Sequence, residues 1–337
     1  MKVDVIIPAY NCHDTIDRAL ASCATQKLDD GDTFTVTIVN DASEKGYQDI
    51  VEYWERVLDI QLINKKENAG CGQARQTGID YTDGDYFMFL DADDVFGSPF
   101  AIKALLNEMK TGDYDLVMGD FIEETEDGTF VKHIENWVWC HGKMYKRRTI
   151  DRFLLRFNFT RGNEDVGFHS VLKNLTDNVK YIPQLVYVWE NQNTSLVRGD
   201  SMGYRYGYGW RDFVENIAWA CEELQSRNVN KALIRELACF ALCRIYWQFE
   251  DGRTNLPSEV EKNWDKIVDF YNRAITPFVK DAAVSYPFLL KMMIQLQEQS
   301  NHAHIIPRMT FNQFLTKLGF FDDLKAVEAD YYVDDGG

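Results

Sequence analysis

Four short apolar runs in the first 94 residues each end in a polar or glycine-rich loop. The loops span residues 8–11, 40–43, 68–75 and 91–94. Between the runs, apolar residues recur at helical spacing, so strands and helices alternate along the chain. Strands joined by helices in this way are mostly parallel, and the helices cover both faces of the sheet. The pattern therefore predicts an α/β fold whose four loops share one edge, where such sheets bind ligands.

The fourth apolar run leads directly into three acids, Asp91, Asp93 and Asp94. On an extended tail, side chains two residues apart point the same way, so we expect Asp91 and Asp93 together and Asp94 opposite. Neighbouring carboxylates repel one another unless a cation neutralises them, and a hard divalent ion with oxygen ligands does so. The acids therefore predict a metal site, with a solvated acidic turn as the alternative.

The composition of the chain indicates a globular protein and disfavours several kinds of partner. The chain has 337 residues, of which 45% are hydrophobic, enough for a sizeable core. A formal net charge of −17 disfavours nucleic acid and anionic lipid as partners, although a local basic patch stays open. The start is too short and too charged for a signal peptide, and no apolar run is long enough for a membrane span. Seven scattered cysteines without a C-x-x-C pair indicate reduced thiols and a cytoplasmic protein.

The predicted elements fall into three stretches. The first alternates, with strands at 3–7, 34–39, 60–63, 87–90 and 116–118 and helices at 14–26, 47–57, 72–80 and 101–110. The second has a hairpin around Asp127–Gly128, helices at 149–156 and 165–174, and a strand pair at 179–182 and 186–189. The third is only helical, at 210–226, 230–250, 257–275, 285–299 and 310–317. We place a boundary near Gly199, which gives an α/β domain at 1–199 and a helical region at 200–337.

The order and spacing of the loops carry a family resemblance. The segments are Val5-Ile-Ile-Pro-Ala-Tyr-Asn11, Val39-Asn-Asp-Ala-Ser43, Asn68-Ala-Gly-Cys-Gly-Gln-Ala-Arg75 and Phe89-Leu-Asp-Ala-Asp-Asp94. Weaker matches follow at 141–147, 163–168 and 187–196. Together they resemble glycosyltransferase family 2, whose members have the GT-A fold, a Rossmann-like sheet with helices on both faces. The C-terminal helices match no module of that family.

The resemblance implies roles for particular residues. Those implied to contact the nucleotide-sugar donor are Pro8, Tyr10, Asn11, Asp41, Asn68, Gly70, Arg75, Asp91 and Ala92. Asp93, in the DXD motif, would hold Mn²⁺ or Mg²⁺ on the diphosphate. Asp165 would be the general base, with Glu164 beside it orienting it or binding acceptor. A histidine completes the metal site in some members; here His141 is preferred to His169 or water, and a structural role for His141 is the alternative.

Three of these residues also have structural interpretations. Asp41 is expected to bond the base edge, and the alternative is a cap for the next helix. Arg75 is expected near the phosphates, and the alternative is a surface position paired with Glu67 or Asp80. Asp165 lies at a predicted helix start, where carboxylates are also favoured as caps.

The predicted activity is a metal-dependent, inverting transfer of a sugar from a nucleotide diphosphate sugar, with a UDP-sugar as the expected donor. A diphosphate leaving group requires a cation, and the acceptor hydroxyl requires a base on the opposite side of the anomeric carbon. The acceptor stays open among glycan, glycolipid, polymer and other hydroxyl compounds. The C-terminal helices are expected to bind acceptor or to form a homo-oligomer. The aromatic segment 204–211 suits either sugar stacking or a plain connection.

Two rival functions remain at this stage. One is a noncatalytic module that holds a nucleotide sugar or a partner on the same scaffold. The other is a sugar-1-phosphate nucleotidyltransferase, which the sequence disfavours because such enzymes carry a glycine-rich basic loop after the first strand. Here that place holds Pro8-Ala-Tyr-Asn11.

Overall fold

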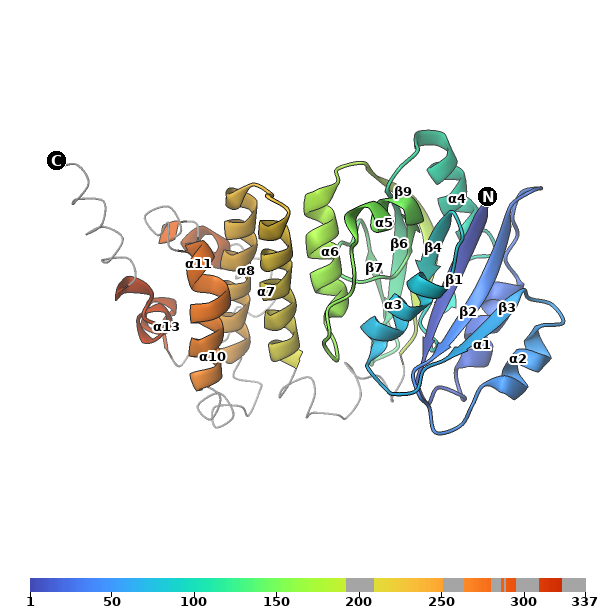
Figure 1. Cartoon of the computed structure of the whole chain (residues 1–337), viewed down its shortest axis with the longest axis horizontal. Helices are drawn as coiled ribbons and strands as arrows, with labels where there is room; N and C mark the ends of the chain where they lie inside the picture. The colour runs from blue at the N-terminus through green and yellow to red at the C-terminus, as the bar shows by residue number, and fades with distance from the viewer. Residues whose placement is uncertain (192–208, 251–263, 280–285, 288, 295–308, 323–337) are drawn as a thin grey trace. The chain divides into compact units, whose positions relative to one another are not determined.

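The computed structural model describes residues 1–191, 209–250, 264–279, 286–287, 289–294 and 309–322 (Figure 1). The chain divides into two compact units, Met1–Ser201 and Met202–Gly337. The first unit is an α/β structure and the second is helical in its described part. The predicted fold class, an α/β GT-A-like unit followed by a helical region, is confirmed, whereas the boundary near Gly199 stays a prediction.

Four neighbouring parallel strands form one half of the sheet in the first unit. Their order is β3 (Ile60–Asn64), β2 (Thr33–Asn40), β1 (Lys2–Ala9) and β4 (Tyr86–Phe89). The apolar runs explain this half, because the central strands are buried on both faces. All four carboxyl ends lie at one edge, so the predicted gathering of the four loops is confirmed.

The other half of the sheet mixes strand directions. Its strands are β8 (Lys143–Lys146), β6 (Leu116–Glu124), β9 (Val179–Trp189), β5 (Val95–Phe96) and β7 (Phe130–His133). Strand β8 runs antiparallel to both β4 and β6, whereas β6 and β9 are parallel. Strands β6 and β7 form the predicted hairpin, and Gly128 in its turn has a φ of 77°.

The predicted strand pair at 179–182 and 186–189 is wrong. These residues form the single strand β9, which pairs with β6 along its length. The register changes from Met118↔Tyr181 to Asp120↔Leu185, so the strand takes up Pro183 in an irregularity and not in a turn. The apolar pattern on both sides of Pro183 resembled two strands because a bulge interrupts alternation as a turn does.

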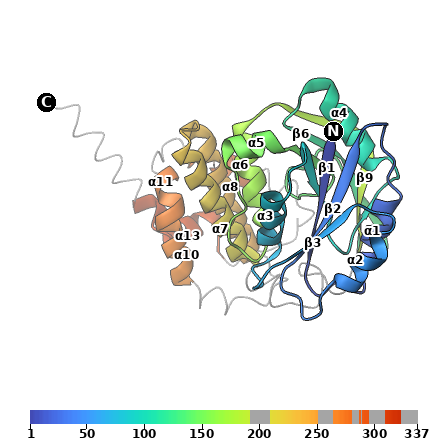
Figure 2. The same cartoon turned by 45° about the vertical axis from the view of Figure 1, so that its right-hand side comes forward.

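Helices cover both faces of this sheet (Figures 1 and 2). Helices α1 (Ile16–Ala24) and α4 (Ala101–Gly112) lie on one face, and α3 (Cys71–Tyr81) and α6 (Glu164–Leu175) lie on the other. The shorter helices are α2 (Gln48–Trp54) and α5 (Arg147–Phe153). Gly78 lets α3 approach the sheet closely, because a Cβ there would lie 2.3 Å from Ile6 Cγ2.

The described part of the second unit is helical, with undescribed stretches after α8 and after α11. They are α7 (Gly209–Ser226), α8 (Lys231–Glu250), α10 (Trp264–Phe270), the π-helix η2 (Tyr271–Ile275), α11 (Thr276–Val279) and α13 (Phe311–Lys317). Helix α7 packs on α8 and buries the stripe Ile217, Cys221 and Leu224. Residues 204–208 of the aromatic segment and parts of the helices predicted at 257–275 and 285–299 lie outside the described residues. Across the described part of the chain, the helices are too short or too polar to span a membrane.

Candidate active site

The first two loops at the carboxyl edge are joined by hydrogen bonds between backbone N–H groups of one loop and oxygen atoms of the other. Asn11 donates its N–H to Ser43 Oγ at 3.0 Å, and its Oδ1 accepts from Glu44 N at 3.0 Å. Its φ of 50° is left-handed, a conformation that asparagine tolerates better than most residues. Asp41 N donates to Ala9 O at 2.9 Å. These bonds explain why an asparagine and a short polar loop follow the first strand.

Asp41 holds the third loop against the second. Its carboxylate, 2% exposed, accepts from Gly70 N at 2.8 Å and from Ala69 N at 3.1 Å, and it pairs with Lys65. It does not cap helix α2, which begins at Gln48. The structural alternative of a cap is therefore wrong, and the predicted bond to a nucleotide base stays a prediction.

The other predicted donor contacts differ in exposure. Tyr10 is 52% exposed and Asn68 is exposed, so both are accessible at the edge. Pro8 is buried in β1, opposite Val39 of β2, and Ala92 is buried in the core. The buried members can shape the edge through their backbone, whereas Tyr10 and Asn68 can contact a ligand directly.

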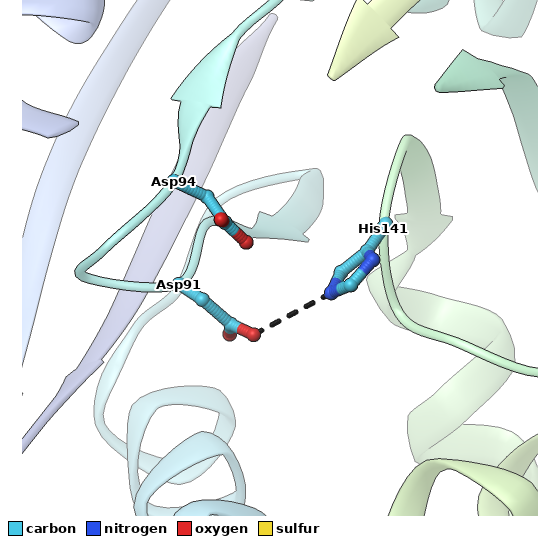
Figure 3. A group of neighbouring side chains, drawn as sticks. All are labelled: Asp91, Asp94 and His141. Carbon is cyan, nitrogen blue, oxygen red and sulfur yellow. Dashed lines mark ion pairs between the residues drawn. The ribbon is translucent and has the colours of Figure 1, made fainter. Parts of the chain in front are cut away.

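The acidic loop after β4 is a turn and not an extended tail. Asp94 N donates to Asp91 O at 3.1 Å, which closes the chain over the two residues between them. Asp91 and Asp94 therefore both point toward His141 (Figure 3). The expectation that Asp94 points away from Asp91 is wrong, because alternation of side chains holds only for extended backbone. That Asp91 and Asp93 share a side stays a prediction.

Asp91, Asp94 and His141 form a group that can hold a metal ion. One ligand atom from each lies within 4.8 Å of the others, and Asp91 Oδ2 is 3.5 Å from His141 Nε2. Asp93 is not a member of this group. The predicted role of Asp93 as a ligand stays a prediction. Asp94, which the sequence interpretation placed opposite Asp91, is a further candidate ligand.

The ionisation of this group fits a cation site. Burial raises the pKa of Asp94 well above its ordinary value, and the charges of Asp93 and Asp91 raise it further. Burial also opposes ionisation of Asp91, but the Arg75 guanidinium and His141 hold the pKa of Asp91 well below its usual range. Burial lowers the pKa of His141, which favours the neutral imidazole that binds metals.

The two candidate histidines have different environments. His141 is 6% exposed and stacks on Tyr187, with ring centroids 4.6 Å apart. Its Nδ1 has no hydrogen-bond partner among the residues that the structure describes. His169 uses both ring nitrogens inside the protein, with Nε2 2.7 Å from Tyr145 Oη and Nδ1 3.0 Å from Val138 O. The geometry thus favours His141 over His169 as a ligand.

Arg75 joins the acidic loop to the start of helix α6. Its side chain is 5% exposed, with Nη1 2.5 Å from Glu164 Oε1 and Nη2 2.7 Å from Asp91 Oδ1. The surface interpretation, with Glu67 or Asp80 as partner, is therefore wrong. Sequence alone gave no hint of these partners, because Glu164 lies 89 residues further along the chain.

Gly72 makes the approach of the two helices possible. A Cβ at this position would lie 2.6 Å from Glu164 Cγ, closer than side chains pack. The glycine-rich third loop therefore serves the protein's own packing, by letting Glu164 reach Arg75 across the start of α3.

Asp165 occupies the first turn of α6, where its ionisation is unusual. Its Oδ1 accepts from Val166 N at 2.9 Å, and the N-cap residue is Asn163, so Asp165 is not the cap. Burial raises the pKa of Asp165 to about 7, and the nearby charge of Glu164 raises it as well. Burial also raises the pKa of Glu164, against the opposing effect of Arg75. A carboxyl group with a pKa near neutrality can accept a proton from a substrate.

Tyr187 is a site residue that the sequence interpretation missed. Its hydroxyl donates to Asp94 Oδ2 at 2.5 Å and accepts from Asp91 N at 3.2 Å, while its ring supports His141. Tyr187 opens the last of the weakly matched segments, so its place in that segment was the one available sign.

Comparisons with known proteins agree with this architecture. The family Glycosyl transferase family 2 matches residues 4–169. The uncharacterized glycosyltransferase YibD of Escherichia coli is 35% identical over 348 residues, covering 92% of this chain and 98% of YibD. Glycosyltransferase GlyA of Streptococcus pneumoniae is 25% identical over 225 residues, but the chain spans only 32% of its length. The uncharacterized glycosyltransferase EpsJ of Bacillus subtilis is 27% identical over 221 residues, and the chain spans 62% of its length.

A solved structure shares the fold. The crystal structure of S. aureus TarS 1-349 in complex with UDP-GlcNAc superposes with a TM-score of 0.67 at 17% sequence identity, over 90% of this chain and 93% of TarS 1-349. The motifs at one sheet edge, the family match and the full-length relationship to YibD lead to one conclusion: the chain belongs to glycosyltransferase family 2 and is a glycosyltransferase.

Proposed function

We propose that this glycosyltransferase is metal-dependent and inverting, and that it takes its sugar from a UDP-sugar in a single displacement with Asp165 as the general base. The observation that carries the proposal is one connected set of charged side chains. Arg75 Nη2 lies 2.7 Å from Asp91 in the metal group, and Nη1 lies 2.5 Å from Glu164, the neighbour of the proposed base. This link through Arg75 supports a cation site and a base that act on the same substrate.

Asp165 has the properties that a general base needs. It is partly exposed, so a hydroxyl group can reach it, and its pKa of about 7 makes proton exchange effective near neutral pH. It would take the proton of the acceptor hydroxyl as the oxygen bonds to the anomeric carbon and the nucleotide diphosphate leaves. Glu164, bonded to Arg75, would orient the helix start.

The residues of the acidic loop fit a divalent cation. Two carboxylates and one imidazole offer atoms within 4.8 Å of one another, and such a mixed set suits Mn²⁺ at least as well as Mg²⁺. A cation would also offset the repulsion that raises the pKa of Asp94. When bound, it would neutralise the charge of the departing diphosphate. Asp91, Asp94 and His141 are the proposed ligands, with Asp93, the ligand inferred from the DXD motif, as a further candidate.

The donor is proposed from the loops at the same edge. TarS, which shares the fold, has been solved with UDP-GlcNAc and with UDP. The joined first and second loops offer the exposed Tyr10 ring for a base, and Asp41 belongs to the second of these loops. The third loop presents Asn68 at the edge. These features support a uridine nucleotide and do not distinguish one sugar from another.

A panel of nucleotide sugars tests the proposal. A ligand that binds the native state raises the melting temperature, so UDP-sugars with Mn²⁺ should raise it more than GDP-sugars do. UDP release from the best donor should require Mn²⁺ or Mg²⁺. Hydrolysis of a UDP-α-sugar, with water as acceptor, should first yield the β-anomer in time-resolved NMR. A first-formed α-anomer, or release unaffected by chelator, would overturn this mechanism.

A further inference from the structure

A cluster of aromatic side chains lies directly beside the metal group. The His141 ring is 5.0 Å from the Trp189 ring, measured between centroids, and Trp189 is 5.3 Å from Trp139. The Trp139 ring is also nearly parallel to the His141 ring, with the centroids 6.4 Å apart and an angle of 14° between the ring planes. We call Trp139 and Trp189 the tryptophan pair. Neither belongs to the metal group or to the proposed base.

The exposure to solvent differs across the aromatic cluster, with Tyr187 and Phe121 buried and the tryptophan pair partly exposed. Tyr187 and Phe121, which support it from below, are both 0% exposed. Trp139 and Trp189 are each partly exposed, although they pack on the same core. Two adjacent, partly exposed indoles offer flat apolar surface that a ligand ring can cover. Here the largest rings keep contact with solvent next to charged groups.

The loop that carries Trp139 is held by several polar bonds. Asn136 Oδ1 accepts from the N–H groups of residues 138 and 139, at 2.8 and 3.1 Å. Lys143 Nζ donates to the carbonyl of Trp139, and His169 Nδ1 bonds the carbonyl of residue 138. His169 lies one helical turn after Asp165 on α6. Trp139 is therefore tied to the helix that carries the proposed base.

Trp189 is tied to the acidic loop. It lies two residues after Tyr187 on β9, so both rings are on the face of His141. The next residue, Glu190, donates its N–H to Asp94 Oδ1 at 2.9 Å. The tryptophan pair thus spans from the loop that would hold the donor diphosphate toward the helix that would hold the base.

We propose that the tryptophan pair is an acceptor subsite and that the acceptor is a carbohydrate with a pyranose ring. The inference rests on the function proposed above and adds the chemical class of its acceptor. A pyranose has an apolar C–H face that packs on an indole, while its hydroxyl groups point outward from the ring edge. The hydroxyl groups of a sugar seated there would lie between the acidic loop and α6, the helix that carries Asp165. An acyclic polyol or a serine side chain has no such face.

Fluorine NMR of the full chain labelled with 5-fluorotryptophan tests this subsite. UDP and Mg²⁺ are added first, and their binding, followed by melting temperature, tests the donor site separately. A set of methyl pyranosides (glucoside, galactoside, mannoside and N-acetylglucosaminide) is then titrated, with ribitol as the acyclic control. At least one pyranoside should shift the resonances assigned to Trp139 and Trp189 through W139F and W189F, and ribitol should not. Trp54, on α2, is the internal control, whose resonance should stay in place.

Substitution measures the contribution of the indole face. With Trp189 as the reporter, W139A should raise the dissociation constant of the bound pyranoside roughly three- to tenfold, and W139F, which keeps an aromatic face, should raise it less. Melting temperatures of the variants identify any loss of folding. The proposal is overturned if no pyranoside moves either resonance, if ribitol moves them equally, or if W139A binds like the wild type. Failure of UDP to bind would instead count against the proposed function.

Discussion

The acidic loop after β4 and the start of α6 both present neighbouring carboxylates, but their ionisation differs. In the loop, Arg75 and His141 hold the pKa of Asp91 well below its usual range despite burial. At the helix, burial and Glu164 raise the pKa of Asp165 to about 7. The residue type is the same, so the environment decides whether a carboxylate serves to attract a cation or to exchange a proton.

The acidic loop and the start of α6 share one arginine. Arg75 contacts the loop directly through Asp91, whereas it reaches the helix through Glu164. Burial and the charge of Glu164 have the larger effects on the pKa of Asp165. The charge of Arg75 lowers that pKa by a smaller amount. The buried guanidinium of Arg75 therefore keeps Asp91 charged, while the pKa of the proposed base Asp165 stays at about 7.

The largest effect is expected from Asp165→Asn. An amide of the same shape cannot accept the acceptor proton, so kcat for sugar transfer should fall by roughly two to four powers of ten. UDP release in the presence of acceptor measures it. Asp151→Asn, at an exposed position on α5, is the matched control and should leave kcat unchanged. Wild-type kcat in the Asp165 variant would remove Asp165 from the mechanism.

Arg75→Gln tests the connection that Arg75 makes between the acidic loop and helix α6. Removing the guanidinium leaves Asp91 and Glu164 without their partner. Breaking such a buried ion pair lowers the free energy of unfolding by about 3 kcal/mol. Urea unfolding measures this loss. The double variant Arg75→Gln with Glu164→Gln should be more stable than the sum of the single losses predicts, because the unpaired Glu164 charge is gone. Strictly additive losses would mean that Arg75 does not join the two regions energetically.

The loop is tested alone by exchanging its histidine. His141→Phe keeps the stack on Tyr187 but removes Nε2, so Mn²⁺ affinity should fall about tenfold or more. His169→Phe removes a histidine whose ring nitrogens are engaged elsewhere, so Mn²⁺ affinity should not change. Calorimetric titration with Mn²⁺ gives both values. Equal affinities in the two variants would exclude His141 as a ligand.

The pH dependence of kcat/KM tests the start of helix α6 separately from the acidic loop. A base works only when deprotonated, so kcat/KM should rise about tenfold per pH unit below pH 7 and level off above it. Glu164→Gln removes a charge that raises the pKa of Asp165 and should move the midpoint down, whereas Arg75→Gln should move it up. The expected shifts are smaller than the losses above. Identical midpoints in all three proteins would contradict the assignment of the base.

Much of the first half of the fold was predictable from local pattern. Buried parallel strands are near-continuous apolar runs, so β1 to β4 and their loops could be located, and parallel strands place those loops at one edge. The ends of their strands located Asp41 and Asp91 at that edge. The roles of Asp41 and Asp165 came from the resemblance to glycosyltransferase family 2.

The remainder depends on tertiary contacts that periodicity does not contain. The turn that brings Asp94 in place of Asp93 toward His141 depends on one backbone hydrogen bond, from Asp94 N to Asp91 O. The insertion of β8 between β4 and β6 pairs segments distant in sequence, and the pairing of Arg75 with Glu164 does the same. The irregularity at Pro183 in β9 imitated a turn, which led to the wrong strand pair.

The central claim, that the acidic loop and His141 hold the cation beside the donor diphosphate, is tested most directly by anomalous scattering. Crystals grown with Mn²⁺ and UDP should show one strong manganese peak within coordination distance of the acidic loop and His141, bridging to the diphosphate. A manganese peak elsewhere, or UDP bound at this edge with no metal at the loop, would contradict the account.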